Sequence, residues 1–322
     1  MKVLITGAGG FLGKRLSQAL VDQFDQIALV ITDVVEPPSP TIKDGSNAKV
    51  HSVKADLCVE SERSKLLEIV GPFDKVFMLH GIMSGGSEAD FDLGMAVNVD
   101  ATRGMLELLR HKCPGIRVVF TSSTGVYGGK MPKVITEDVI PIPQSSYGAE
   151  KTICEYLVGD YGRRGFLDSI AIRYPTVIVR PGPPSSATSS FCSGIIREPL
   201  AGQDAELPVS RDLAMWFGAV SNVVHNTVYA GFGLDTSAIE AGESRTINLP
   251  GVTVTVQQML DALVEVGGEK MLDHIKDKKD PKLERIVTSW PAIFDTKKAN
   301  ALGFRADPGF KQAIYDYVKE QQ

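Results

Sequence analysis

The chain has 322 residues, which is long enough to bury a large core, either as one α/β domain or as one domain with a smaller lobe. Hydrophobic residues make up 43% of the chain and charged residues 23%, as is ordinary for a globular protein. The formal net charge of −5 argues against nucleic acid or an anionic membrane as the main partner. We therefore expect a globular protein whose partner is a small molecule.

The cysteines and the apolar runs indicate where such a protein acts. Four cysteines occur: Cys58, Cys113, Cys154 and Cys192. Their wide spacing fits neither a zinc motif nor a disulfide framework, so we expect reduced thiols, no metal and a cytoplasmic location. The first two residues lead directly into an apolar run, which leaves no room for a signal peptide. No apolar run reaches membrane-spanning length.

The chain begins with a predicted strand, a glycine-rich turn and a helix. Residues 3–5 form a short apolar run, and Gly7, Gly10 and Gly13 follow it. Apolar residues then recur at helical spacing over residues 16–24. Such a turn places backbone N–H groups at the positive end of a helix, where they form a cradle for a pyrophosphate. Because a glycine pattern alone is a weak signal, an ordinary strand-to-helix loop is the alternative.

An acidic residue after the second predicted strand favours a dinucleotide. The apolar run of residues 27–32 ends at Asp33, which lies 20 positions after Gly13. A carboxylate there accepts hydrogen bonds from both ribose hydroxyls and repels a 2′-phosphate. Val34 and Val35 follow, with no arginine that could hold such a phosphate. This pattern predicts NAD rather than NADP as the cofactor.

Strands and helices then alternate. Further strands are predicted at residues 50–54, 75–79, 116–120 and 169–173, and helices at residues 61–70, 91–112 and 147–162. Alternation of this kind predicts an α/β fold with a doubly wound parallel sheet and right-handed crossovers. Ligands of such sheets bind beyond the carboxyl ends of the strands, where the polar residues named here are expected to gather.

Two short motifs carry candidate catalytic side chains. Tyr147 and Lys151 lie four residues apart on a predicted helix, so they share one face. A free tyrosine has a pKa near ~10, and a neighbouring ammonium favours the phenolate and brings that pKa toward neutral pH. Ser122 and Ser123 leave the fifth strand, where a hydroxyl can bond the same substrate oxygen as the tyrosine. Both patterns also occur by chance, but their order after a nucleotide-binding half favours catalysis.

Together these motifs resemble the extended short-chain dehydrogenases/reductases of the NAD-dependent epimerase/dehydratase family. The similar motifs are T-G-A-G-G-F-L-G, D-L at residues 56–57, A-V-N-V-D-A-T, S-S-T-G-V-Y-G and Y-G-A-E-K, and they span residues 1 to about 182. The resemblance implies a Rossmann fold with a smaller C-terminal lobe that binds the substrate. It also implies that Tyr147 is the acid/base, that Ser123 orients the substrate oxygen and that Lys151 binds the nicotinamide ribose.

The resemblance further implies a set of cofactor contacts, with Asp56 and Leu57 at the adenine, His80 along the cofactor and Asn98 supporting a helix. The residues that it assigns to the cofactor are Gly7, Gly10, Phe11, Leu12, Gly13, Asp33, Asp56, Leu57, His80, Gly81, Asn98, Tyr147, Lys151, Pro175 and Val177. Family members commonly dimerise through helices corresponding to residues 91–112 and 146–162, so a homodimer is expected.

The second half is similar to dehydrogenases of small sugar acids such as D-erythronate, most clearly in the run S-S-F-C-S-G-I-I-R-E-P-L. One or two arginines suffice to hold a small carboxylate, and the candidates are Arg180, Arg197 and Arg211. Any of them could instead form a structural ion pair. The remaining substrate candidates are hydroxyl residues: Ser84, Ser122, Ser123 and Ser190.

The domain boundaries follow from these motifs. Residues 1–182 are expected to form the NAD-binding domain, with later returns near residues 219–250 and 295–322. Residues 183–322 are expected to form mainly the substrate lobe. Within them we expect a strand at residues 245–249, and helices at residues 191–200, 220–231, 256–267 and 310–318. The charged residues 276–282 are expected to be a solvated turn.

The predicted reaction is NAD-dependent oxidation of a secondary alcohol on a small sugar acid to a keto acid, with Tyr147 as the acid/base. A carbonyl reductase or a nucleotide-sugar epimerase/dehydratase could use the same catalytic residues. However, nucleotide-sugar enzymes of the family usually carry asparagine where Thr176 stands. A non-catalytic NAD sensor is a further alternative, although such relatives usually lose the Tyr-Lys pair that this chain keeps.

Overall fold

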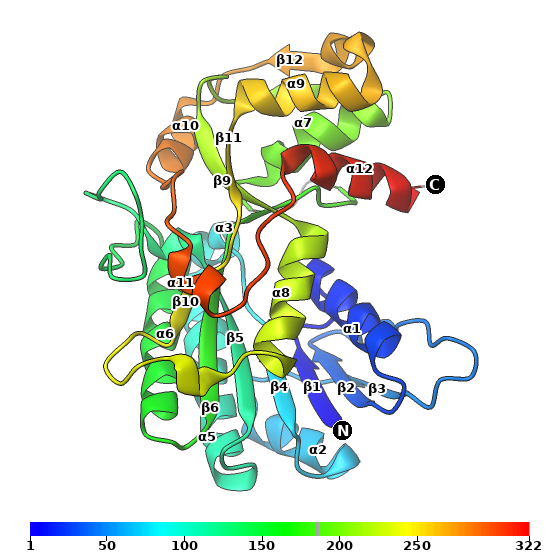
Figure 1. The fold of residues 1–322 in the computed structure, drawn as a ribbon, viewed down its shortest axis with the longest axis vertical. Coiled ribbons are helices and arrows are strands. Elements are labelled where there is room, and N and C mark those ends of the chain that lie inside the picture. Colours follow the sequence, from blue (N-terminus) through cyan, green and yellow to red (C-terminus); the bar gives the residue numbers. More distant parts are fainter. Residues whose placement is uncertain (184–186, 322) are drawn as a thin grey trace.

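The central feature of the computed structural model, which describes residues 1–183 and 187–321, is a seven-stranded parallel sheet below a smaller lobe (Figure 1). The strand order is β10-β6-β5-β4-β1-β2-β3, and each neighbouring pair is parallel. The order reverses between β1 and β4, which is where a ligand crevice opens in doubly wound sheets. The predicted α/β, doubly wound fold is therefore confirmed.

The first half of the chain supplies most of this sheet and the helices that cover it. The strands are β1 (Lys2–Thr6), β2 (Ala28–Asp33), β3 (Lys49–Lys54), β4 (Lys75–Met78), β5 (Arg117–Ser123), β6 (Asp168–Tyr174) and β10 (Thr246–Asn248). The covering helices are α1 (Phe11–Gln23), α2 (Glu60–Val70), α5 (Ala101–Lys112), α6 (Ser146–Arg163) and α8 (Val220–Phe232).

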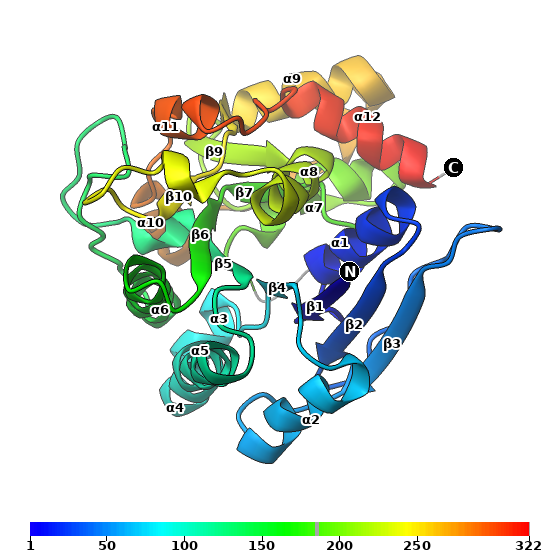
Figure 2. The ribbon, with the colours of Figure 1, turned by 60° about the horizontal axis from the view of Figure 1, so that its bottom comes forward.

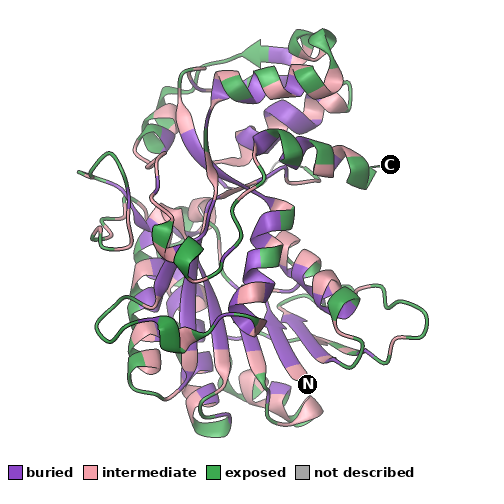
Figure 3. Ribbon diagram, viewed as in Figure 1, coloured by how far each residue is buried: buried purple, intermediate pink, exposed green. Residues whose placement is uncertain are grey.

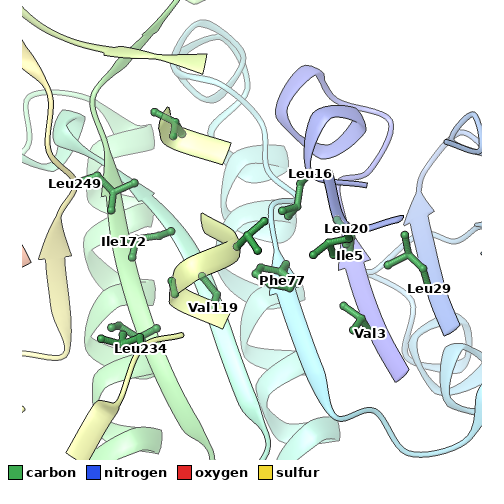
Figure 4. Packing of buried hydrophobic residues seen from close by; sticks show 14 of the residues in the cluster. Val3, Ile5, Leu16, Leu20, Leu29, Phe77, Val119, Ile172, Leu234 and Leu249 are labelled. Carbon is green, nitrogen blue, oxygen red and sulfur yellow. The ribbon is translucent and has the colours of Figure 1, made fainter. Parts of the chain in front are cut away.

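Both faces of the sheet are buried because helices cover each of them. Figure 2 shows α1 and α8 on one face and α2, α5 and α6 on the other. Successive residues of a strand pack on opposite faces of the sheet: Val3 and Ile5 pack with α1 and α8, whereas Leu4 packs with α2 and α5. Figure 4 shows Phe77 and Val119 in the first of these layers. Figure 3 shows the central strands buried and the outer helix faces exposed.

The stretch predicted as one long helix at residues 91–112 contains an irregular turn. It consists of α4 (Phe91–Gly94), a π-helical turn (Met95–Asp100) and α5 in sequence. Such turns often occur at functional sites. Here the turn carries Asn98, whose side chain is buried.

The lobe contains two further small sheets. One has the order β11-β9-β7 and the other pairs β12 with β8. Its elements are β7 (Thr176–Ile178), α7 (Ser190–Leu200), β8 (Ala205–Leu207), β9 (Ala214–Ala219), β11 (Val252–Thr255), α9 (Val256–Gly267), β12 (Ile275–Asp277), α10 (Pro281–Thr288) and α12 (Phe310–Gln321). The Ser/Pro-rich start of this half includes residues 184–186, which lie outside the described residues.

The charged stretch at residues 276–282 corrects the prediction of a simple turn. Lys276 lies in β12 and Lys282 in α10, so only residues 278–280 connect the two elements. Residues 276–277 pair with β8 as part of β12. Asp280 caps α10 by accepting hydrogen bonds from two backbone N–H groups.

The last part of the chain contacts both layers of the molecule. Ala299 and Phe304, in and after α11 (Lys297–Ala301), pack into the core beside α1 and α8. Phe310 and Ile314 of α12 pack instead into the core of the lobe. Among the described residues no helix is both long and apolar enough to cross a membrane.

Candidate active site

A cavity of about 500 Å³ opens at the carboxyl ends of the sheet strands, between the sheet and the lobe. Seventeen of the residues predicted to contact cofactor or substrate line it: Gly7, Gly10, Phe11, Leu12, Gly13, Asp33, Gly81, Ser84, Ser122, Ser123, Tyr147, Lys151, Pro175, Val177, Arg180, Ser190 and Arg197. The structure therefore brings the glycine turn, the two motifs with candidate catalytic side chains and part of the lobe into one space.

The glycine turn between β1 and α1 depends on the absence of side chains. Gly7 has φ +68°, a conformation that favours glycine. A Cβ at Gly13 would lie 2.3 Å from the carbonyl oxygen of Gly7, so only glycine lets the helix approach the strand this closely. Gly10 borders the cavity, and a Cβ there would meet only that same oxygen, at 3.3 Å. The bare backbone at the start of α1 can therefore approach a phosphate.

Asp33 stands at the end of β2, beside this turn. Its Oδ2 accepts a hydrogen bond from Gly9 N at 3.0 Å, and its Oδ1 accepts one from Val34 N at 2.8 Å. Each carboxylate oxygen accepts more than one hydrogen bond, so the oriented group keeps capacity for hydroxyl donors.

Ser123, Tyr147 and Lys151 all line the cavity. Lys151 Nζ donates to the carbonyl oxygen of Thr121 at 2.9 Å and lies 5.8 Å from the centroid of the Tyr147 ring. Ser123 Oγ accepts from Gly125 N at 3.0 Å, which fixes the hydroxyl at the end of β5. A phenol, a hydroxyl and an ammonium can together bind, orient and deprotonate an alcohol.

Burial changes the pKa of two of these groups. It raises the pKa of Tyr147 to about 12; the Ser123 hydroxyl opposes this rise, and Glu150 adds to it. Burial also lowers the pKa of Lys151, against the charges of Cys154, Glu150 and Glu155. The expected fall of the Tyr147 pKa toward neutral pH is therefore not found, because desolvation of the phenolate dominates.

His80 and Asn98 lie behind the cavity and do not border it. His80 Nδ1 lies 2.7 Å from Thr6 Oγ1, and its Nε2 lies 3.2 Å from Thr102 Oγ1. Burial, reinforced by Lys151, lowers the pKa of His80 to about 3, so the ring is neutral. Asn98 Oδ1 accepts from Ile82 N at 2.7 Å, which fixes the main chain beyond β4.

Two arginines of the lobe border the cavity. Arg180 donates to the carbonyl oxygen and the hydroxyl of Ser189, both at 3.1 Å. Arg197 donates to the carbonyl oxygen of Arg180 at 2.8 Å and pairs with Glu198 at 2.5 Å. None of the carboxylates in the described ranges forms an ion pair with Arg180, and burial lowers its pKa. Arg180 can therefore receive an anion.

Some predicted residues have other surroundings. Arg211 is partly exposed and pairs with Asp277 at 2.9 Å, outside the cavity, so its predicted role as substrate anchor is not supported. Asp56 is exposed, and its Oδ1 accepts from Cys58 N at 2.9 Å at the start of α2; neither it nor Leu57 lines the cavity. Ser122 borders the cavity, but its hydroxyl donates its one proton to buried Glu155 at 2.5 Å, so only its oxygen remains, as an acceptor, for a substrate.

The structure adds residues to which the sequence assigned no role. Trp216 and Trp290 line the cavity. Trp290 stands between Ser289 and Pro291, and no pattern named above includes it. Glu150, within Y-G-A-E-K, is buried behind Tyr147, and nothing in the sequence alone indicates its partners. No group of three or more metal-binding side chains stands together in the part of the chain that the structure describes.

Comparison with known sequences identifies the family. The family described as "NAD dependent epimerase/dehydratase family" matches residues 3–230. The chain belongs to this family. It is 41% identical over 321 residues to the D-erythronate dehydrogenase of Haemophilus influenzae, with 99% of each chain covered. It is 40% identical to the D-erythronate dehydrogenase of Cupriavidus necator, covering 99% of this chain and 98% of that relative. The chain is thus an NAD-dependent dehydrogenase.

A solved structure of the same family has the same fold. It is described as the nucleoside-diphosphate-sugar epimerase from Agrobacterium tumefaciens and is 36% identical, with a TM-score of 0.91. The match covers 100% of this chain and 94% of the other. The agreement includes the lobe, which therefore belongs to the family architecture.

The residues at the cavity fit NAD, the cofactor of the family. The bare backbone at Gly10 leaves the start of α1 open to a pyrophosphate, and Asp33 is oriented for ribose hydroxyls. The glycine turn and Asp33 would hold the adenosine half, and Tyr147 and Lys151 would meet the nicotinamide half. When bound, NAD supplies a hydride acceptor and a positive charge.

Proposed function

We propose that this dehydrogenase oxidises a secondary alcohol of a small sugar acid, such as D-erythronate, to the corresponding keto acid. Two relatives named D-erythronate dehydrogenase, at 41% and 40% identity over nearly the whole chain, support this substrate class. The observation that carries the proposal is a guanidinium, Arg180, that shares one cavity with Tyr147 and Ser123.

Arg180 suits the carboxylate of such an acid. Its partners Ser189 O and Oγ are neutral, whereas Arg197 beside it already has Glu198. A partly buried cation without a counterion is unfavourable, and a substrate carboxylate relieves this while forming two parallel hydrogen bonds. Arg180 is therefore the proposed anchor, and Ser84 and Ser190, which border the same cavity, are the proposed hydroxyl partners.

In the proposed reaction, the substrate hydroxyl lies between Ser123 and Tyr147. The Tyr147 phenolate would accept the hydroxyl proton, and NAD held by the glycine turn and Asp33 would supply the acceptor for the hydride of the same carbon, which would become a carbonyl. Ser123 donates to the oxygen on which negative charge develops. Lys151, which is held by Thr121 O, provides positive charge beside the phenolate. The products are the keto acid, NADH and one proton.

The proposal is tested by following NADH formation over a panel of sugar acids. The panel contains four-carbon aldonates, six-carbon aldonates and uronates, with the matching neutral sugars as controls for the carboxylate. We expect turnover of at least one acid and about 10²-fold lower kcat/KM for its neutral analogue, because the Arg180 contact is lost. NAD binding without turnover of any member would contradict the proposal and favour a sensor.

A nucleotide-sugar epimerase is the second candidate, favoured by the match to the Agrobacterium tumefaciens structure at 36% identity. Thr176, which lines the cavity where related nucleotide-sugar enzymes usually carry asparagine, weakens it. Epimerisation returns the cofactor to its oxidised form, so incubation with nucleotide sugars would change product stereochemistry without net NADH. Such a result, with no acid oxidised, would replace the proposal.

A further inference from the structure

One wall of the cavity is a segment with little stability of its own. Met83 and Ser84 line the cavity at the start of α3 (Ser84–Ala89). This helix has only six residues, and two of them are Gly85 and Gly86. Short helices are marginal in water and glycine weakens them further, so tertiary contacts must fix the position of this wall.

The strongest of these contacts lead to Glu150 on the catalytic helix α6. Ser87 Oγ, on α3, donates to Glu150 Oε2 at 2.9 Å. Asn98 Nδ2 donates to the same oxygen at 2.5 Å and to Ile82 O, just before the wall, at 3.0 Å. Ser87, Asn98 and Glu150 are at most 1% exposed, so water does not compete for these hydrogen bonds. A second link from α3, Glu88 Oε1 to Ser146 N at 2.6 Å, is exposed.

Glu150 contacts the wall segment through its side chain and lies on the same helix as Tyr147 and Lys151. It lies between Tyr147 and Lys151 in the sequence of α6. Its Oε1 has no hydrogen-bond partner among the described residues and rests against Gly94. A Cβ at Gly94 would lie 2.4 Å from this oxygen, so the close approach of the carboxylate requires glycine there.

We propose that Glu150 is a positioning residue: through Ser87 and Asn98 it holds α3 at a set distance from Tyr147 and so limits the length of the acid that the cavity accepts. The substrate class in this statement rests on the proposed function. The holding of α3 by Glu150 does not, because it concerns only contacts within the chain. Loss of the Ser87 hydrogen bond frees α3 to move outward, which enlarges the cavity and favours longer acids.

The test compares Ser87→Ala with Ser169→Ala. Ser169 lies on β6, outside the cavity lining, and is equally buried. Its hydroxyl also donates to α6, at the carbonyl oxygen of Val158, over 2.6 Å. Each variant loses one buried hydroxyl bonded to the same helix. The readout is the ratio of kcat/KM for a four-carbon acid to that for its six-carbon homologue. We expect this ratio to fall about fivefold in Ser87→Ala and to stay unchanged in Ser169→Ala.

Glu150→Gln provides the conservative variant. The amide oxygen still accepts from Ser87 and Asn98, so the chain-length ratio should stay close to that of the wild type. An unchanged ratio in Ser87→Ala, or an equal fall in Ser169→Ala, would overturn the proposal.

Hydrogen–deuterium exchange of residues 83–90 provides a readout that needs no substrate. With NAD present, we expect exchange in this segment to be about tenfold faster in Ser87→Ala than in the wild type and unchanged in Ser169→Ala. If the wild type oxidises no sugar acid but exchange rises as expected, the proposed function fails and the positioning role stands. If exchange does not rise in Ser87→Ala, the positioning role fails whichever substrate is found.

Discussion

At the scale of single residues, the proposed chemistry depends on one phenol. Replacement of Tyr147 by phenylalanine removes the proposed proton acceptor and should lower kcat by about 10²-fold or more. Tyr161→Phe is the matched control, because Tyr161 lies on the same helix, bonds Glu107 and stands outside the cavity. The measurement is the steady-state rate of NADH formation by the wild type and by each of the two variants. If Tyr147→Phe keeps most of the turnover, another group is the base.

The burial of Tyr147 predicts the direction of the pH dependence. Burial raises the pKa of this phenol to about 12, and the phenolate is the proposed reactive form for oxidation. At pH values below that pKa, the phenolate fraction rises about tenfold per pH unit, so kcat/KM at low NAD should rise with pH between about pH 7 and about pH 9. The rise should be absent from the residual activity of Tyr147→Phe. A flat profile in the wild type would contradict the assignment.

Asp33 carries the predicted preference for NAD. Asp33→Asn keeps an oxygen acceptor beside Gly9 N and removes the negative charge that would repel a 2′-phosphate. We expect the ratio of kcat/KM with NADP to that with NAD to rise about tenfold. Asp56→Asn, which changes an exposed carboxylate outside the cavity, is the control and should leave this ratio unchanged. Equal use of both cofactors by the wild type would exclude the role given to Asp33.

At the scale of elements, His80 joins β1 to α5 through Thr6 and Thr102. The pKa of His80 is lowered to about 3 in the folded protein, whereas that of histidine in an unfolded chain is near ~6.5. Between these two pH values the unfolded chain binds a proton that the folded protein does not bind, so the free energy of unfolding falls as the pH falls. From neutral pH to about pH 5 the wild type should lose about 2 kcal/mol more than His80→Gln. Urea unfolding at both pH values measures this, with exposed His111→Gln as the control. An equal loss in His80→Gln would show that His80 remains solvated.

The nucleotide-binding elements could be predicted because local signals specify them. Residues 3–5, 27–32 and 75–79 are short apolar runs bounded by polar or turn residues, and each forms a strand of the large sheet. The glycine turn and Asp33 then follow from the chemistry of a dinucleotide, and the alternation of strand and helix fixes the parallel order. What the sequence did not reveal is the π-helical turn at Met95–Asp100, since its residues read as ordinary helix.

The lobe was less predictable because its strands are short and pair over long separations. β7 has three residues and pairs with β9, about forty positions later, and no local sequence pattern predicts this pairing. The same difficulty explains Arg211, whose place depends on the pairing of β12 with β8 beside it. Glu150 was missed for another reason: its partners Ser87 and Asn98 come from elements whose packing only the folded chain shows.

At the scale of the whole molecule, the cavity joins two parts of the chain with different tasks. The sheet edge brings the glycine turn, Asp33 and the Ser-Tyr-Lys group, whereas the lobe brings Arg180 and the two tryptophans. The first set faces the cofactor that defines the family, and substrate choice is therefore expected to lie in the second set. This division explains why the cofactor could be predicted with less information than the substrate.

The molecule also exposes an apolar surface that its own fold does not cover. Four large apolar side chains on two neighbouring helices are 41–67% exposed: Phe91 and Leu93 of α4, and Ile153 and Tyr156 of α6. Large apolar side chains exposed on neighbouring helices are candidates for a protein–protein interface. The resemblance implies dimerisation through these same helices. In a two-fold symmetric dimer, α4 and α6 would contact their copies, and the four side chains of each subunit would be buried.

The final prediction tests this surface. The protein should have twice the mass of one chain by light scattering, and Tyr156→Glu combined with Phe91→Glu should convert it to a monomer, because two charges per subunit would be buried without partners. Tyr315→Glu, which changes an apolar residue of 45% exposure on α12, should leave the mass unchanged. Since Tyr156 lies on the helix of Tyr147 and Lys151, the monomer should also turn over more slowly if the contact steadies that helix. A monomeric wild type, or a dimer that survives both charges, would place the interface elsewhere.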